Sequence, residues 1–141
     1  KCVENSNTET AYAKIQNGDS ECFPKKWGWS NQIKSSDVYK MPIYAGAGKC
    51  DISKGDLVGE LTVDASGEDI LVTYTAFGVY YFSELHLYIG KDEFPEKLAP
   101  GQFPYKVEEL PTCTQEYTFT VDDIDCKENF YVIAHAVVHG F

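Results

Sequence analysis

Alternation of apolar and polar residues with a period of two is the feature that most constrains the fold of this chain. It begins near residue 37 and is cleanest at 116–121, where Tyr117, Phe119 and Val121 alternate with polar residues. Successive side chains of a β-strand point to opposite faces, so such a segment has one apolar face and one polar face. No segment keeps the 3.6-residue period of a helix over three turns. We therefore expect an all-β protein with no helix longer than about two turns.

The alternating segments are separated by turn-forming residues, which divides the chain into strands. We expect strands at 38–45, 57–64, 69–75, 79–89, 116–121 and 130–138. Two of them, 79–89 and 130–138, are apolar on both faces in places, which predicts central positions. Pro42 places 38–45 at an edge, because proline cannot donate to a ladder. About seven or eight short strands joined by turns are typical of an antiparallel β-sandwich.

A predicted hairpin shows what strict alternation implies for side-chain direction. Leu57, Leu61 and Val63 fall on one face of 57–64, and residues 65–68 form the loop that follows. The alternation therefore predicts that these three side chains share the core.

Charge excludes several classes of partner. The 141 residues include 22 acidic and 12 basic residues, a formal net charge of −10, and every basic residue is a lysine. Phosphate contacts, which arginine makes best, supply most nucleic-acid affinity, so the chain is not expected to bind nucleic acid or an anionic membrane. No apolar run approaches the roughly 18 residues of a membrane span. The length fits one domain, which we place at 9–141 after a polar arm at 1–8.

Five cysteines predict disulfides and an oxidising setting, with five reduced core cysteines as the alternative. No C-x-x-C pair occurs, which excludes zinc ribbons and thioredoxin-type motifs. Two disulfides and one leftover thiol are the simplest arrangement. Cys113 and Cys126 bracket 116–121 and a turn, so a bridge between them is geometrically easy. Cys2, near the start of the chain, is then expected to be a free thiol or to join a second copy.

Three histidines are candidate metal ligands. His135 and His139 are four residues apart in a predicted strand and share a face, and His86 lies on another predicted central strand beside Glu84 and Tyr88. If those strands are neighbours, the three imidazoles can approach one another and hold zinc or copper. The alternative is that the His86 and His135 rings are half-buried and hydrogen-bonded locally, with His139 at the surface.

Acidic loops are candidate calcium sites. The best of them contains Asp122, Asp123 and Asp125, although its spacing is not that of an EF-hand. The alternative is a solvated turn that adds solubility. Apart from such a calcium ion, we expect no cofactor.

Aromatic residues offer a third candidate site. Rings flanked by amides can stack on sugar rings, and the alternation places Tyr80, Phe82 and Tyr88 on one face of a strand. The alternative is that these rings fill the core. The candidate carbohydrate-binding residues are Trp27, Trp29, Asn31, Tyr80 and Tyr88.

A series of segments in chain order is similar to a known module. The segments are ETAYA (9–13), CF (22–23), WGWSN (27–31), IYAGAGKCD (43–51), LHLYIG (85–90), APGQFPY (99–105) and YVIAHA (131–136). They resemble a widespread, poorly characterised module of secreted and cell-surface proteins in bacteria and some algae. The resemblance implies an extracellular or cell-surface setting and no established catalytic activity, so no catalytic residue is carried over.

The resemblance also bears on the cysteines. Cys22 and Cys50 both stand in its segments, which favours a bridge between them. Such modules often end with a cysteine after the last strand, whereas this chain has Val138-His139-Gly140-Phe141 there. The resemblance therefore leaves Cys2 without that partner.

We expect a non-enzymatic extracellular domain that is structural or adhesive, for example the repeating subunit of a surface fibre or matrix. No G-x-S-x-G, H-E-x-x-H or P-loop motif occurs. The arm at 1–8 is expected to order only on meeting a neighbouring copy, by adding a strand to it or through a Cys2 disulfide. The alternative is that Cys2 is bridged within its own chain, which would hold the arm without a partner. The alternatives are a carbohydrate-binding module that takes a polysaccharide and a metalloenzyme built on the histidines.

Overall fold

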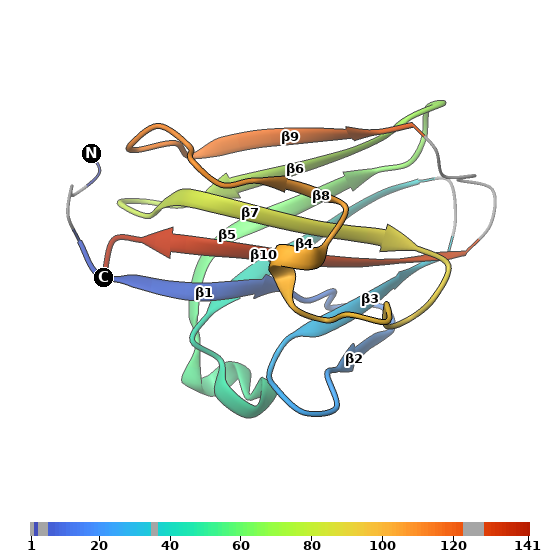
Figure 1. Ribbon diagram of the computed structural model, residues 1–141, viewed down its shortest axis with the longest axis horizontal. Coiled ribbons are helices and arrows are strands. Elements are labelled where there is room, and N and C mark those ends of the chain that lie inside the picture. Colours follow the sequence, from blue (N-terminus) through green and yellow to red (C-terminus); the bar gives the residue numbers. More distant parts are fainter. Residues whose placement is uncertain (1, 3–5, 35–36, 123–128) are drawn as a thin grey trace.

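The computed structural model describes residues 2, 6–34, 37–122 and 129–141 (Figure 1). Over these residues it contains β-strands and short 3₁₀ helices. The strands are β1 (Thr8–Ala13), β2 (Ser20–Cys22), β3 (Trp29–Ile33), β4 (Val38–Ala45), β5 (Asp56–Asp64), β6 (Ile70–Ala76), β7 (Tyr81–Gly90), β8 (Tyr105–Val107), β9 (Glu116–Val121) and β10 (Phe130–His139). The 3₁₀ helices are η1 (Gly48–Cys50), η2 (Ile52–Lys54) and η3 (Pro100–Gln102).

One antiparallel sheet of ten strands includes all of these strands, in the order β2-β3-β10-β1-β4-β5-β6-β9, with β7 on β10 and β8 on β7. β10 is the central strand. It pairs with β7 from Tyr131 to His139, with β3 from Phe130 to Val132, and with β1 from His135 to His139. Figure 1 shows β4 and β5 passing behind β7 and β10, so the sheet folds back over itself and encloses the main core.

The all-β, antiparallel character and the expected strands are confirmed, whereas the sandwich and the count of seven or eight strands are not. The described residues form ten strands in one continuous sheet. The extra strands β1, β2, β3 and β8 are short or lie outside the regular alternation, so periodicity gives little signal for them. The sheet is continuous because the central strand β10 changes partner along one of its edges from β3 to β1.

A β-bulge in β5 reverses the predicted direction of Leu57. Ile43 pairs with Gly59 and Tyr44 pairs with Leu57, so Val58 is the extra residue. Val58 is therefore fully buried, whereas Leu57 is 52% exposed, and the prediction that Leu57 shares the core with Leu61 is wrong. Gly59 permits this geometry, because a Cβ at that position would collide with the backbone carbonyl of Thr75.

A second bulge, in β7, separates residues that strict alternation placed on one face. Val137 pairs with Glu84 and Val138 with Phe82, which leaves Ser83 as the extra residue. Phe82 consequently points into the main core, whereas Tyr88 packs against a second cluster on the outer face. Glu84, His86 and Tyr88 lie together on that outer face.

Pro42 does not mark an edge strand, because β4 lies between β1 and β5. The pairing with β1 ends at Ile43, and the Pro42 carbonyl then accepts a hydrogen bond from the Lys14 amide at 3.0 Å. The nitrogen and carbonyl of a strand residue point to the same neighbour. The missing N–H of Pro42 therefore faces the end of β1, where it interrupts no ladder.

The disulfides confirm one predicted pairing and correct the other. Cys22 pairs with Cys50, with their Cα atoms 6.1 Å apart, as the resemblance favoured. Cys113 pairs with Cys2, with their Cα atoms 5.6 Å apart, so its predicted bridge to Cys126 is wrong and Cys2 is not a free thiol. β9 carries the chain away from Cys113, while Asn7 exchanges backbone hydrogen bonds with Phe141 near the chain start. Cys126 lies outside the described residues.

We expect loss of the Cys2–Cys113 bridge to destabilise the domain more than loss of Cys22–Cys50. The bridges join residues 111 and 28 positions apart. In the chain-entropy model these loops correspond to about 5 and about 3.5 kcal/mol of unfolding free energy. Urea unfolding of the two double Cys→Ser variants measures the difference. Equal stability of the two variants would contradict this expectation.

Asn31 is a buried amide that connects three strands. Its side chain accepts a hydrogen bond from the Ile15 amide at 2.9 Å and donates to the carbonyls of Ala13 and Val132, at 3.1 and 3.2 Å. These hydrogen bonds satisfy backbone groups at the point where the partner of β10 changes from β3 to β1. We expect Asn31→Ala to lower the free energy of unfolding by about 3 kcal/mol, because it leaves buried backbone groups unsatisfied. Gln32→Ala, at a half-buried neighbour, is the control and should change it by less than about 1 kcal/mol in urea unfolding.

Candidate functional site

His86 and His135 form a pair on the outer face of the sheet. They are direct partners in the register of β7 and β10, and their Nδ1 atoms are 3.0 Å apart. Both side chains are buried, with 3% and 6% of their surface exposed. One Nδ1 must therefore be protonated and donate a hydrogen bond to the other.

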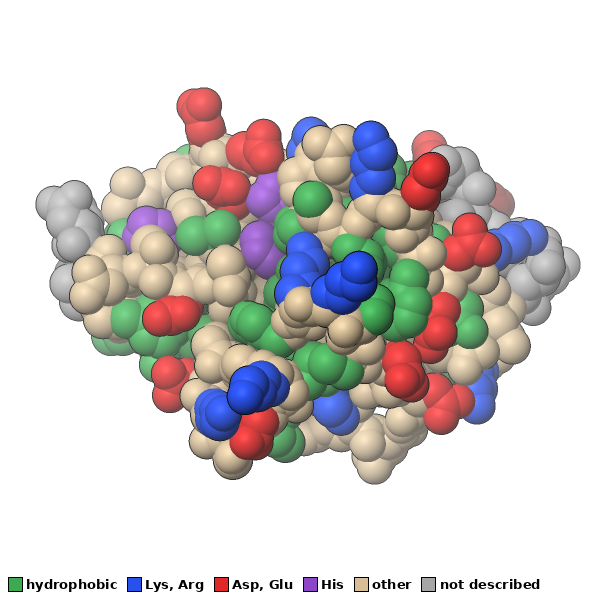
Figure 2. Space-filling view, turned by 60° about the horizontal axis from the view of Figure 1, so that its bottom comes forward, with side chains coloured by type: hydrophobic (Ala, Val, Ile, Leu, Met, Phe, Trp, Pro, Cys, Tyr) green, Lys and Arg blue, Asp and Glu red, His purple; other side chains and the backbone are tan. Residues whose placement is uncertain are grey.

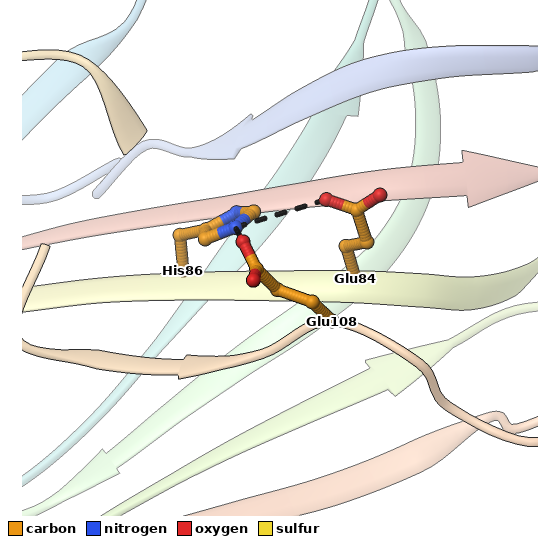
Figure 3. Close-up of side chains that lie close together, drawn as sticks. All are labelled: Glu84, His86 and Glu108. Atoms are coloured by element: carbon orange, nitrogen blue, oxygen red, sulfur yellow. Dashed lines mark hydrogen bonds and ion pairs between the residues drawn. The ribbon is translucent and has the colours of Figure 1, made fainter. Parts of the chain in front are cut away.

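Two carboxylates complete the His86 side of this pair (Figure 3). Glu108 Oε2 lies 2.9 Å from His86 Nε2, and Glu84 Oε1 lies 3.7 Å from the same nitrogen. Glu84 precedes His86 by two residues on β7, and Glu108 directly follows β8. We call Glu84, His86, Glu108 and His135 the histidine–carboxylate cluster.

The environment gives the cluster an asymmetric distribution of charge. Burial, with the charges of His86 and Lys26 as further causes, lowers the pKa of His135 to about 3. The hydrogen bond from His86 is the main reason why the pKa of Glu108 is lowered. Burial raises the pKa of Tyr12, whose ring lies 5.0 Å from that of His135. His135 is thus a neutral ring at the inner end of the cluster, and the carboxylates form its outer, charged end.

His139 does not join the cluster, so the predicted three-histidine site is not formed. Its register partner is Tyr81, and the two rings stack with centroids 4.7 Å apart. The predicted approach of His86 and His135 is present, whereas Glu84 and Glu108 were not predicted as ligands. The Glu-x-His spacing of Glu84 and His86 was a usable signal, because it places both on one strand face. Glu108 had no such signal, because β8 is only three residues long.

The predicted carbohydrate-binding residues do not form one exposed platform. Trp29 and Asn31 are buried, with 2% and 0% of their surface exposed. Trp27 packs on Trp29 in the outer-face cluster, with ring centroids 5.6 Å apart. Tyr88 donates its hydroxyl hydrogen to the Asp92 carbonyl at 2.9 Å, whereas Tyr80 packs on Phe141. The rings serve mainly as a second core beneath the loops on the outer face.

The calcium prediction falls largely outside the described residues. Asp122 is exposed at the end of β9, and Asp123 and Asp125 are not among the described residues. The acidic loop therefore stays a prediction.

A pocket of about 220 Å³ lies on the outer face of β4 and β5. Two of the residues that line it, Leu57 and Phe77, are 52% and 41% exposed. On the face shown in Figure 2, histidine side chains reach the surface beside acidic ones, and apolar side chains are exposed around a central group of lysines. The residues lining the pocket are Gln16, Lys40, Met41, Pro42, Tyr44, Leu57, Gly59, Glu60 and Phe77.

Comparisons with protein-family models, curated proteins and solved structures find no match for this chain. Within the part of the chain that the structure describes, no helix has the length and apolar character needed to cross a membrane. The two disulfides indicate an oxidising environment.

We expect His135 to make the metal-free domain less stable as the pH falls. In the unfolded chain His135 takes up a proton near its ordinary pKa of about 6.5, whereas in the folded protein its pKa is about 3. The unfolded state therefore binds more protons between these values, and this residue removes about 2 kcal/mol of stability between pH 7 and pH 5.

Urea unfolding across this pH range, with a chelator present, measures the effect. His135→Gln should lose that component of the pH dependence, and His139→Gln, the control, should retain it. An unchanged pH dependence in His135→Gln would show that His135 is not held neutral.

Proposed function

We propose that this chain is a non-enzymatic structural or adhesive domain of an extracellular setting, and that it associates with further copies of itself. The observation that carries the proposal is a group of exposed apolar side chains, Leu57, Phe77 and Val79, which we call the apolar patch. Their exposed fractions are 52%, 41% and 42%. Leu57 and Phe77 line one pocket, and Val79 lies in the turn that follows Phe77. Exposed apolar side chains gathered in this way are typical of an interaction site.

The backbone holds the apolar patch in place. The bulge at Val58 turns Leu57 outward, and the Phe77 amide donates to the Val58 carbonyl at 2.8 Å. The Tyr80 amide donates to the Phe77 carbonyl at 3.0 Å and closes the turn that presents Val79. A preorganised apolar surface loses little conformational entropy on association, which favours binding.

The charge around the patch favours a second copy over a strongly charged partner. The chain has a formal net charge of −10, whereas the pocket that Leu57 and Phe77 line carries one lysine, Lys40, and one glutamate, Glu60. Two copies that meet here bring little net charge into contact. The repulsion between their remaining acidic surfaces acts at longer range and is screened by salt. Association should therefore strengthen as salt is added.

The disulfides support the extracellular part of the proposal. Cys2–Cys113 ties the beginning of the chain to the segment before β9, and Cys22–Cys50 ties β2 to η1. Covalent ties of this kind persist in secreted and surface proteins, where no reducing pool removes them. The resemblance to a secreted and cell-surface module implies the same setting.

Sedimentation velocity over a range of protein and salt concentrations tests self-association. We expect oligomers whose size increases with both concentrations. Leu57→Glu and Phe77→Glu should each weaken the association at least tenfold, since each buried apolar side chain contributes about 1.5–3 kcal/mol. Leu71→Glu is the matched control, because Leu71 is 40% exposed near the opposite end of β6 from Phe77.

Electron micrographs of the same samples show whether the association is open-ended, as a fibre requires. A chain that stays monomeric at every salt concentration would refute the proposal. Retention of that monomer on immobilised polysaccharide would favour the carbohydrate-binding alternative instead.

A further inference from the structure

We propose that Glu84, His86 and Glu108 form a binding site for a divalent transition-metal ion of the zinc type. The three side chains come from β7 and from the residue after β8, and they converge above the outer face of the sheet (Figure 3). One ligand atom from each lies within 4.8 Å of the other two. This site is separate from the apolar patch and does not depend on self-association.

The distances suit a zinc ion with little rearrangement. Ligand atoms about 2.1 Å from a tetrahedral zinc ion lie about 3.4 Å from one another. His86 Nε2 is 2.9 Å from Glu108 Oε2 and 3.7 Å from Glu84 Oε1, so these separations lie on either side of the required value. The carboxylate side chains are 40% and 50% exposed, which leaves them free to adjust and leaves a coordination position open to water.

The donor set selects the class of ion. Imidazole nitrogen with carboxylate oxygen suits zinc and its first-row neighbours, whereas calcium requires six to eight oxygen ligands. The histidine–carboxylate cluster offers calcium only Glu84 and Glu108 beside a nitrogen that it binds poorly. The site is therefore distinct in chemistry from the acidic loop considered for calcium.

The sheet places two negative charges side by side at this point. Leu85 pairs with Val107, so Glu108, the residue that follows β8, comes beside Glu84. Like charges opposite each other on neighbouring strands are destabilising. A divalent cation bound between them removes this repulsion.

His135 prepares His86 for the metal. A metal on His86 Nε2 requires the ring proton to be on Nδ1, and this nitrogen lies 3.0 Å from His135 Nδ1, which can accept it. Metal-binding histidines ordinarily donate their second ring N–H to an acceptor such as a carboxylate, a carbonyl or water, which fixes the tautomer and the ring orientation. Here the acceptor is the His135 ring. His135 is thus a positioning residue that does not itself touch the ion.

One nearby charge opposes the ion and provides a sharper test. Lys106 is the register partner of His86 across β7 and β8, and its ammonium donates to the Gly101 carbonyl at 2.9 Å. Its positive charge repels a metal at the cluster, with partial screening by solvent. Lys106→Gln should therefore raise the affinity for zinc a few-fold, a change that a merely structural cluster would not produce.

Isothermal titration of the metal-free protein with zinc chloride at neutral pH is the experiment. We expect one zinc ion per chain at the cluster, lost in His86→Gln, weakened at least tenfold in Glu84→Gln and Glu108→Gln, and weakened about 10- to 100-fold in His135→Gln. His139→Gln and Glu116→Gln are matched controls outside the cluster and should bind as the unchanged chain does.

Glu108→Gln keeps the test decisive if His86→Gln fails to fold, because the Glu108 side chain is 50% exposed and the change is isosteric. Circular dichroism confirms that each variant is folded. ¹⁵N NMR of the histidines should show a large zinc-induced shift at His86 Nε2. Absence of zinc binding at millimolar concentration would overturn the proposal. Binding that survives both His86→Gln and Glu108→Gln in folded protein would also overturn it, as would binding lost in His139→Gln.

Discussion

The fold depends on the shared edge of β10. This strand pairs along its length with β7, while its other edge pairs with β3 at one end and with β1 at the other. A strand that changes partner leaves a gap in the ladder, and an unsatisfied backbone group inside a core is costly. The Asn31 amide closes that gap through Ile15, Ala13 and Val132. A single buried side chain thus lets one sheet carry both the main core and the outer aromatic cluster.

Two bulges then decide what the outer surface presents. The extra residue Val58 exposes Leu57, and the extra residue Ser83 allows Phe82 to enter the core while His86 faces outward. Without the second bulge, Phe82 and His86 would share a face, and a histidine in the main core would displace an apolar side chain. Bulges commonly re-aim side chains next to functional sites. Here the apolar patch and the histidine–carboxylate cluster each lie beside one.

The sequence was informative where the local pattern decides the structure and uninformative where pairing between distant segments does. Alternation located β5, β6, β7, β9 and β10, because each is long enough to show a buried face. It could not locate Val58 and Ser83 as bulges, since a bulge is defined by the register of the partner strand. Gly59, inside a strand, was the one local sign of the bulge at Val58.

The partner of Cys113 also depends on distant segments, because Cys2 is 111 residues away and only the folded sheet brings the two together. Of the cluster, the pairing of His86 with His135 followed from two apolar strands being neighbours, whereas Glu108 depended on the short strand β8.

The two surface features make opposite demands on the same acidic chain. Self-association requires that copies with a net charge of −10 approach one another, which neutral surface and salt make easier. The histidine–carboxylate cluster places two negative charges close together, because Glu84 and Glu108 flank a single imidazole nitrogen. A divalent ion bound between them would neutralise part of this charge and so reduce the repulsion between copies. The metal site that we propose would therefore ease the association that we propose through net charge alone, because the two features share no residue.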